Sequence, residues 1–366
     1  MGSEHMSKTR LFRRAIVVAA ATVALTAAAA VTPALADPGP SMTANHNSVN
    51  IAVKGPGNSL EFYWAANGTA TWGPETVAGF GSTYSAPSMA VDGNSVNIVA
   101  EGPGHSLLFY WAVNGTSTWH AETIAGPGSA YSAPSIASDG NVVNIAVEGP
   151  DHSLSFYWAY VGTATWNLEN VAGPGTTFSA PSMAINGNAH AANISAVEAG
   201  GTLMFYWAVY GTGTWHAESI AGNISDAQPS MIATGNAVNI AAISYRGTVM
   251  FYWAFNGTPT WHAEVVSGHG RAYNGASLVA NSGAATVAAQ GRQNSLTFFW
   301  ATYGTGTWHA ENVRGPFSTF SVPSITANDN SVNISAAGNG GRLMFYWAAN
   351  GSNTWHPETV AGPGSI

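Results

Sequence analysis

The sequence contains seven copies of one unit, and each copy carries two tryptophans eight residues apart. All 14 Trp residues belong to these pairs, and successive units begin 46 to 49 residues apart. The first Trp of the pairs is Trp64, Trp111, Trp158, Trp207, Trp253, Trp300 and Trp347, and the second is Trp72, Trp119, Trp166, Trp215, Trp261, Trp308 and Trp355. A period of this length predicts a repeat architecture in which each unit packs on its neighbours.

The second unit shows what one repeat folds into. Two stretches of small and β-branched residues, 88–92 and 95–101, predict two short strands, and the apolar stretch 107–112 predicts a third strand covered on both faces. The dipeptide Asn114-Gly115 predicts a tight type I′ turn into a fourth strand over 119–125. Four strands in each of seven units predict an all-β fold, a seven-bladed β-propeller with four antiparallel strands per blade.

The order of the strands also predicts how the ring closes. The repeats begin with a strand of the first kind at 40–43 and end with a strand of the fourth kind at 355–361. Each blade is then continuous in sequence, so we expect side-chain packing, rather than a shared blade, to join the last blade to the first.

The first 36 residues predict a leader that is not part of the fold. Residues 1–5 look like a cloning remnant, and four basic residues (Lys8, Arg10, Arg13 and Arg14) precede an apolar stretch at 15–31. Ala34-Leu35-Ala36 then forms a cleavage site of the A-x-A type, so we expect a secretory signal peptide cleaved after Ala36. The alternative is a membrane anchor, but 17 apolar residues are few for a span.

This boundary leaves a single propeller domain over 37–366, which we expect to be secreted and not inserted in a membrane. Whether it is exported by the Sec or the Tat route stays open.

Charge and cysteine content exclude several functions. Six basic and 17 acidic residues follow Ala36, so the net charge of the mature chain is −11 with His neutral. Nucleic acids and anionic membrane surfaces need a basic footprint, and we expect neither as a partner. The chain has no Cys, which excludes disulfides, thiolate nucleophiles and Cys-ligated metals.

The candidate binding residues repeat with the second Trp of each pair. A Glu follows that Trp by three residues in all seven units, and a His follows it directly in five; blade 1 has Gly73 and blade 3 has Asn167 instead. We expect these residues to form sugar pockets in blades 2, 4, 5, 6 and 7. The predicted ligand-binding residues are Trp119, His120, Glu122, Trp215, His216, Glu218, Trp261, His262, Glu264, Trp308, His309, Glu311, Trp355, His356 and Glu358.

Two roles are open for these side chains. The repeated Glu is expected to be half-buried and to need hydrogen-bond donors, which are either backbone or indole N–H groups of the next blade, or paired sugar hydroxyls. The second Trp suits the apolar face of a sugar with its N–H free for hydroxyls, and the His shares a face with the Glu, so the two could pair. No metal site or cofactor is expected, because the copies lie on separate blades.

The repeat also carries a family resemblance. Its Pro-Ser strand, Gly-Asn turn, FYW strand, Asn-Gly turn and W-x-x-E strand resemble the PLL-like bacterial lectins of the Photorhabdus type, over about 320 residues. The tachylectin and fungal fucose-lectin propellers are similar in their repeat organisation. The resemblance implies a seven-bladed propeller with shallow sugar pockets between adjacent blades. This sequence lacks a repeated Arg of that family and has Glu101, Glu148 or, in other blades, a neutral residue in its place.

Together these features predict a secreted, multivalent carbohydrate-binding protein whose partners are glycans or polysaccharides. The alternative is a non-catalytic scaffold propeller that binds other proteins. We do not expect an enzyme, because the predicted inner strands are small and uncharged, as in Ser88-Met89-Ala90-Val91, and no catalytic motif is present.

Overall fold

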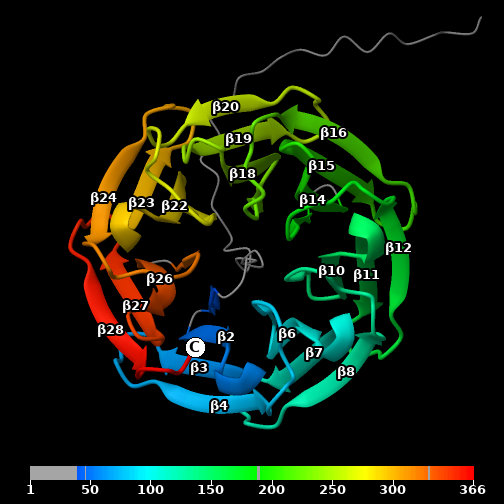
Figure 1. The fold of residues 1–366 in the computed structure, drawn as a ribbon, viewed down its shortest axis with the longest axis horizontal. Coiled ribbons are helices and arrows are strands. Elements are labelled where there is room, and N and C mark those ends of the chain that lie inside the picture. The colour runs from blue at the N-terminus through cyan, green and yellow to red at the C-terminus, as the bar shows by residue number, and fades with distance from the viewer. Residues whose placement is uncertain (1–38, 46, 188–189, 329) are drawn as a thin grey trace, which may run out of the picture.

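The computed structural model describes residues 39–45, 47–187, 190–328 and 330–366, and its strands form a ring (Figure 1). Seven antiparallel four-stranded sheets surround a central axis, and each sheet takes its strands in sequence order. The prediction of an all-β, seven-bladed propeller is therefore confirmed. The predicted signal peptide, residues 1–36, lies outside the described residues. Within the described part of the chain, no helix is long and apolar enough to cross a membrane.

The blades are numbered in chain order. Blade 1 contains β1 (Ser41–Ala44), β2 (Ser48–Lys54), β3 (Leu60–Ala66) and β4 (Gly73–Ala78). Blade 2 contains β5 (Ser88–Asp92), β6 (Ser95–Gly102), β7 (Ser106–Val113) and β8 (His120–Ala125). Blade 3 contains β9 (Ser135–Ser138), β10 (Val142–Glu148), β11 (Leu154–Tyr160) and β12 (Asn167–Ala172). Blade 4 contains β13 (Ser182–Asn186), β14 (Ala191–Glu198), β15 (Thr202–Val209) and β16 (His216–Ala221).

The other three blades repeat this order. Blade 5 contains β17 (Ser230–Thr234), β18 (Ala237–Ile243), β19 (Val249–Phe255) and β20 (His262–Val265). Blade 6 contains β21 (Ala276–Asn281), β22 (Ala284–Gln290), β23 (Leu296–Thr302) and β24 (His309–Arg314). Blade 7 contains β25 (Ser324–Ala327), β26 (Ser331–Gly338), β27 (Arg342–Ala349) and β28 (His356–Ala361). Short 3₁₀ turns join the second and third strands of four blades: η1 (Pro56–Asn58), η2 (Pro103–His105), η3 (Pro150–His152) and η4 (Arg292–Asn294).

The alternation of side chains along the third strand explains how the blades stack. In β7, Phe109 and Trp111 share one face because side chains two apart do. That face is toward blade 3, since both residues belong to a core cluster with residues of that blade. Tyr110 lies on the other face and joins a core cluster with Leu60 and Phe62 of blade 1. Strand β7 is therefore apolar on both faces, as the sequence predicted, and the core is divided into clusters that span neighbouring blades.

The predicted type I′ hairpin turn is wrong. Asn114 does not have a positive φ, and only Gly115 does, at +79°. The Thr116 N–H donates to the Val113 carbonyl at 3.0 Å, so the turn has the backbone pattern of type II. Strand β8 begins at His120 rather than at Trp119, because Trp119 leaves the ladder and reaches across to blade 1.

Buried serines connect the inner strands around the ring. The Ser hydroxyl of each Pro-Ser or equivalent strand accepts the backbone N–H of the next blade's inner strand. In the first of these bonds, Ser41 Oγ accepts from Met89 at 3.0 Å. The other six bonds join Ser88 to Ile136, Ser135 to Met183, Ser182 to Met231, Ser230 to Leu278, Ser277 to Ile325 and Ser324 to Met42. These serines are no more than 1% exposed, so each hydroxyl satisfies a backbone group that water does not reach.

The same kinds of contact close the ring between blades 7 and 1. Ser324 Oγ accepts the Met42 N–H at 3.0 Å, and Leu343 and Phe345 of blade 7 share one core cluster with Met42 and Ile51 of blade 1. No strand crosses this junction in the described residues, since each sheet contains four consecutive strands. Closure by side-chain packing is what the order of the strands predicted.

Candidate functional site

Each repeated Glu connects two tryptophans of adjacent blades. Glu122 Oε1 accepts the indole N–H of Trp111 in its own blade at 3.2 Å, and Oε2 accepts the indole N–H of Trp166 in blade 3 at 3.2 Å. The pattern recurs at all seven junctions, with N···O distances of 2.8 to 3.2 Å, and Trp72 to Glu358 completes the circle at 3.2 Å. A hydrogen bond to the next blade's indole, one of the two predicted roles of the Glu, is therefore present throughout.

Strand register explains this geometry. Trp111 lies directly opposite His120, and Phe109 lies directly opposite Glu122. Trp111 and Glu122 are therefore diagonal neighbours on one face, within reach of a long side chain. The second Trp arrives from the next blade, where it packs edge-on against the same strand; Trp166 meets Phe109 with a centroid distance of 5.2 Å.

The structure divides the predicted Trp-His-x-Glu set between two junctions. Trp119 donates its N–H to Glu75 of blade 1 at 2.9 Å, whereas His120 and Glu122 gather around Trp111. The expectation that the second Trp keeps a free N–H is therefore wrong, because that N–H is used at every junction. The same division applies to the corresponding residues of blades 4 to 7.

The repeated His stacks on the first Trp of its own blade. His120 and Trp111 lie with ring centroids 4.1 Å apart and planes 17° apart, and the same stack occurs in blades 4, 5, 6 and 7. This contact takes the place of the predicted His–Glu pairing. Blade 1 has Gly73 at this position, and the uncovered Trp64 is 42% exposed.

A cavity of about 800 Å³ lies between blades 7 and 1. It is on the face of the ring that carries the turn between β1 and β2 and the loop between β3 and β4. Trp72, Phe345 and Trp347 contribute aromatic surface to its wall, and Glu358 lies among them. The predicted site residue Glu358 is thus part of the cavity, whereas Trp72 and Trp347 were not predicted as ligand residues. The volume falls within the range of small-molecule sites.

The polar groups of the cavity are neutral amides and hydroxyls. They come from Asn45, Asn67, Thr69, Asn328, Asn330, Ser331 and Asn333. Asn333 is 2% exposed, and its Nδ2 has no hydrogen-bond partner among the described residues. Its Oδ1 accepts the Ser331 hydroxyl at 3.3 Å. A buried amide N–H without a partner is costly, and Asn333 is among the residues that line the cavity.

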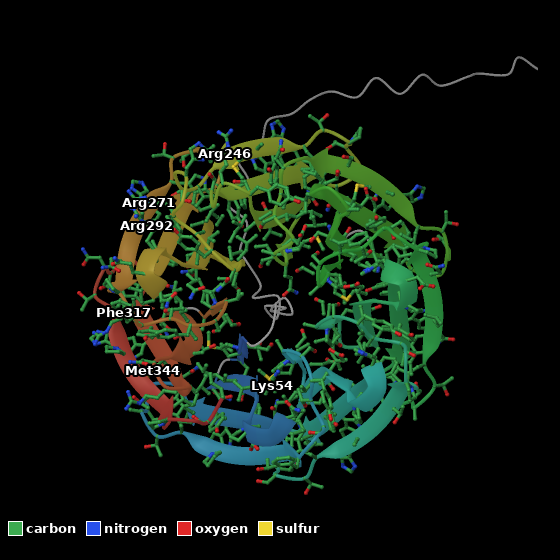
Figure 2. The ribbon with its side chains drawn as sticks, viewed as in Figure 1. Lys54, Arg246, Arg271, Arg292, Phe317 and Met344 are labelled. Carbon is green, nitrogen blue, oxygen red and sulfur yellow. The ribbon has the colours of Figure 1, made fainter. Side chains whose placement is uncertain are left out.

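Positive charge lies elsewhere on the ring. Figure 2 shows Arg246, Arg271 and Arg292 at the outer edge of blades 5 and 6, and no Lys or Arg is among the described residues that line the cavity. Within the described chain, no group of three or more His, Cys, Asp or Glu side chains could hold a metal ion. The cavity therefore presents one carboxylate, neutral hydrogen-bonding groups and aromatic surface.

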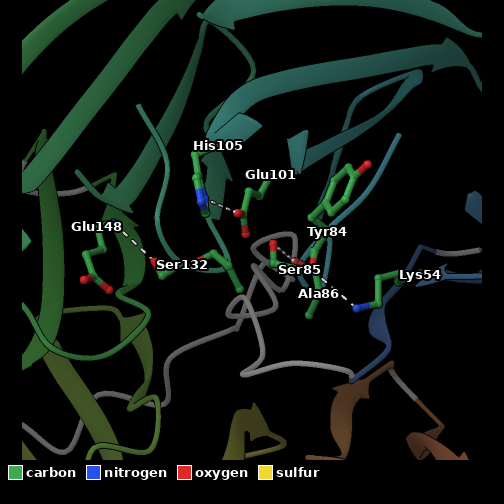
Figure 3. A network of polar contacts seen from close by, with 9 residues as sticks. Lys54, Tyr84, Ser85, Ala86, Glu101, His105, Ser132 and Glu148 are labelled. Carbon is green, nitrogen blue, oxygen red and sulfur yellow. Dashed lines mark hydrogen bonds and ion pairs between the residues drawn. The ribbon is translucent and has the colours of Figure 1, made fainter. Parts of the chain in front are cut away.

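The opposite face of the ring carries a second set of polar residues (Figure 3). The Glu101 carboxylate accepts from His105 Nδ1 at 2.7 Å, and His105 stacks on Tyr131 at a centroid distance of 4.6 Å. Glu148 repeats the pairing with His152 at 2.6 Å, and burial raises the pKa of Glu148 above its ordinary value. These carboxylates, which stand where the resembled family has Arg, have partners within their own blades.

The site residues that sequence reasoning missed are the first Trp of each blade and the asparagine opposite it. Asn333 lies directly opposite Trp347 across β26 and β27. Six blades have an Asn at this position and blade 6 has Thr286. This second repeated polar residue was the available signal, since residues directly opposite each other in paired antiparallel strands lie on the same face of the sheet.

Fold and junctions define a seven-bladed β-propeller with a repeated Trp–Glu–Trp connection between blades. The family described as "Outer membrane protein assembly factor BamB" matches residues 57–295, more than half of the chain. The chain belongs to this family. No curated protein matches the sequence.

Solved structures share the propeller architecture, and the Aleuria aurantia lectin among them is described as six-bladed. The BP39L lectin from Burkholderia pseudomallei is 18% identical with a TM-score of 0.73, and the match covers 87% of this chain and 95% of that one. The Aleuria aurantia lectin, solved with Fucα1-6GlcNAc, is 12% identical with a TM-score of 0.54, covering 74% of this chain and 93% of that one. A prolyl endopeptidase is 10% identical with a TM-score of 0.55, and the match covers 89% of this chain but half of that enzyme.

Proposed function

We propose that this protein is a secreted, non-catalytic lectin that binds neutral sugars between its blades. The observation that carries the proposal is the cavity between blades 7 and 1, where aromatic rings lie beside uncharged amides and hydroxyls. A sugar presents an apolar ring face and neutral hydroxyls, which match aromatic surface and amide groups respectively. The lectin structures that share the fold support the same class of ligand.

Within the cavity, Trp72 and Trp347 would contact the sugar ring, and the Asn333 amide would donate to a hydroxyl oxygen. Glu358 already accepts two indole N–H groups, at 3.2 and 2.9 Å, but a carboxylate has lone pairs for further donors. It can therefore accept a sugar hydroxyl while it holds the blades together. The Glu and Trp residues of this site recur at the other junctions, and each further junction that binds sugar would add affinity for clustered glycans, because several weak pockets then lie on one ring.

Secretion rests on the leader-like residues 1–36, and its test is the N-terminus of the protein recovered from culture medium. The glycan proposal is tested with the chain from Asp37 onward on a glycan array, followed by calorimetric titration of each sugar that binds.

The variant Asn333→Ala removes the unpaired amide and should weaken binding at this cavity about 3- to 10-fold, the value of one neutral hydrogen bond. Asn239→Ala is the matched control, because Asn239 occupies the same position in blade 5 but donates to Thr234 within the protein, at 2.8 Å. No binding on the array, or equal loss with both variants, would contradict the proposal.

A second candidate is a scaffold that binds other proteins, favoured by the match to the assembly-factor family. It predicts a defined protein partner whose binding Asn333→Ala leaves unchanged, together with an array that remains empty.

A further inference from the structure

The first residue after the third strand differs from blade to blade, and in blades 1, 4, 6 and 7 its side chain lies at the junction with the preceding blade. This loop position is Asn67, Asn114, Val161, Tyr210, Asn256, Tyr303 and Asn350 in blades 1 to 7. Its backbone is held alike in blades 1, 4 and 6. The N–H of Asn67, Tyr210 and Tyr303 donates to the turn between the first two strands at 2.9, 2.9 and 3.0 Å. The side chains therefore start from equivalent places, and their length decides what fills the junction.

In blade 4 the loop position fills the junction with blade 3. The Tyr210 ring packs against the core cluster that these two blades share. Its hydroxyl lies 3.3 Å from Nδ2 of Asn144, which donates to it. Asn144 holds in blade 3 the position that Asn333 holds in blade 7, directly opposite the first Trp. Burial raises the pKa of Tyr210, in agreement with a hydroxyl enclosed between blades.

Blade 6 closes its junction with blade 5 in the same way. The Tyr303 hydroxyl lies near Thr234 at the end of β17, and burial raises the pKa of Tyr303 to about 12. Thr234 also accepts from Asn239, so a chain of polar contacts leads from the tyrosine to the asparagine opposite Trp253. Tyr303 as a whole residue is 38% exposed, so it lies at the rim of the junction.

The junction between blades 7 and 1 has the equivalent asparagine, Asn333, but no tyrosine at the loop position. Asn67 lines the cavity and is too short to fill it, and the buried Asn333 Nδ2 is unpartnered there. We propose that Tyr210 and Tyr303 are built-in occupants of two ligand pockets, and that a hydroxyl-bearing neutral ring takes the equivalent place beside Asn333 at the junction between blades 7 and 1. The loop position then determines which junctions bind ligand. This proposal rests on the proposed sugar site for its natural ligand, but not for its geometry.

The test exchanges the residues at the loop position and uses p-cresol, the tyrosine side chain as a free molecule, alongside the best sugar from the array. Crystals of the wild-type ring soaked in p-cresol should show it between blades 7 and 1. Asn67→Tyr should remove that site, and Tyr210→Asn should add one between blades 3 and 4. Titration with p-cresol should show one site fewer per ring in Asn67→Tyr and one site more per ring in Tyr210→Asn. Tyr160→Asn, which changes a tyrosine that is 60% exposed, is the control and should alter neither.

The outcomes separate the two proposals. If p-cresol is absent from the open junction of the wild type, or stays there in Asn67→Tyr, the occupant proposal is overturned. If sugars bind but Asn67→Tyr binds them as well as the wild type does, the occupant proposal fails and the lectin proposal stands. If p-cresol follows the exchanges while no sugar binds, the occupant proposal stands and the lectin proposal fails. If Tyr210→Asn does not fold, Asn67→Tyr alone tests the occupant proposal, and the melting temperature of Asn67→Tyr shows whether that variant is folded.

Discussion

Replacing Glu122 by Gln tests whether the Trp–Glu–Trp connection holds adjacent blades together. The carboxylate accepts from Trp111 and Trp166, and an indole N–H can only donate. The Gln amide has one accepting oxygen, so its NH₂ group must face the other indole N–H, donor against donor. One charge-assisted hydrogen bond is lost and one half-buried donor remains unpaired, which we expect to lower the free energy of unfolding by about 1–3 kcal/mol.

Glu61→Gln is the matched control. Glu61 also accepts two side-chain hydrogen bonds, from Ser59 at 2.6 Å and Thr76 at 2.8 Å. Those donors are hydroxyls, which can rotate and accept from the new NH₂ group, so the same isosteric change should cost much less.

Equilibrium unfolding in urea, followed by Trp fluorescence, measures both variants. Equal stability of Glu122→Gln and Glu61→Gln would refute the argument from donor chemistry. A large loss of stability with unchanged sugar affinity would identify Glu122 as structural, whereas weakened sugar binding at unchanged stability would restore its predicted ligand role.

Three further changes test other parts of the ring. Ser277→Ala removes the acceptor of the buried Ile325 N–H and should lower the free energy of unfolding by about 1–3 kcal/mol in urea titrations; a stability equal to wild type would show that the inner serines do not stabilise the ring. His216→Ala removes the stack on Trp207 and should cost about 0.5–1.5 kcal/mol in the same assay, and a larger loss would mean that the stack is not its main contact. Burial raises the pKa of Glu148, so the folded protein holds this proton more tightly than the unfolded chain does, and unfolding free energy falls as pH rises from the ordinary value of 4.5 through the raised pKa. Glu148→Gln should therefore gain stability relative to wild type between pH 4 and pH 7 in thermal melts, and a constant difference would contradict the raised pKa.

The sequence by itself determined the architecture. Seven Trp pairs at one period give the number of blades, and period-two alternation in stretches such as 107–112 gives strands covered on both faces. These features are local or repeated, so they can be read without knowing which residues meet. The continuous four-strand blades and the side-chain closure between blades 7 and 1 followed from strand order alone.

Only the tertiary structure decided which repeated residues meet. Glu122 lies 11 residues from one indole partner and 44 from the other, and nothing in the spacing shows that Trp119 bonds to the preceding blade instead of its own. The stagger between neighbouring blades sets that pairing. It also places the loop side chain against the blade before it, where the long Tyr210 fills the junction and the shorter Asn67 leaves a cavity. Strand periodicity describes a single blade, whereas the contacts at a junction depend on the side chains of two blades.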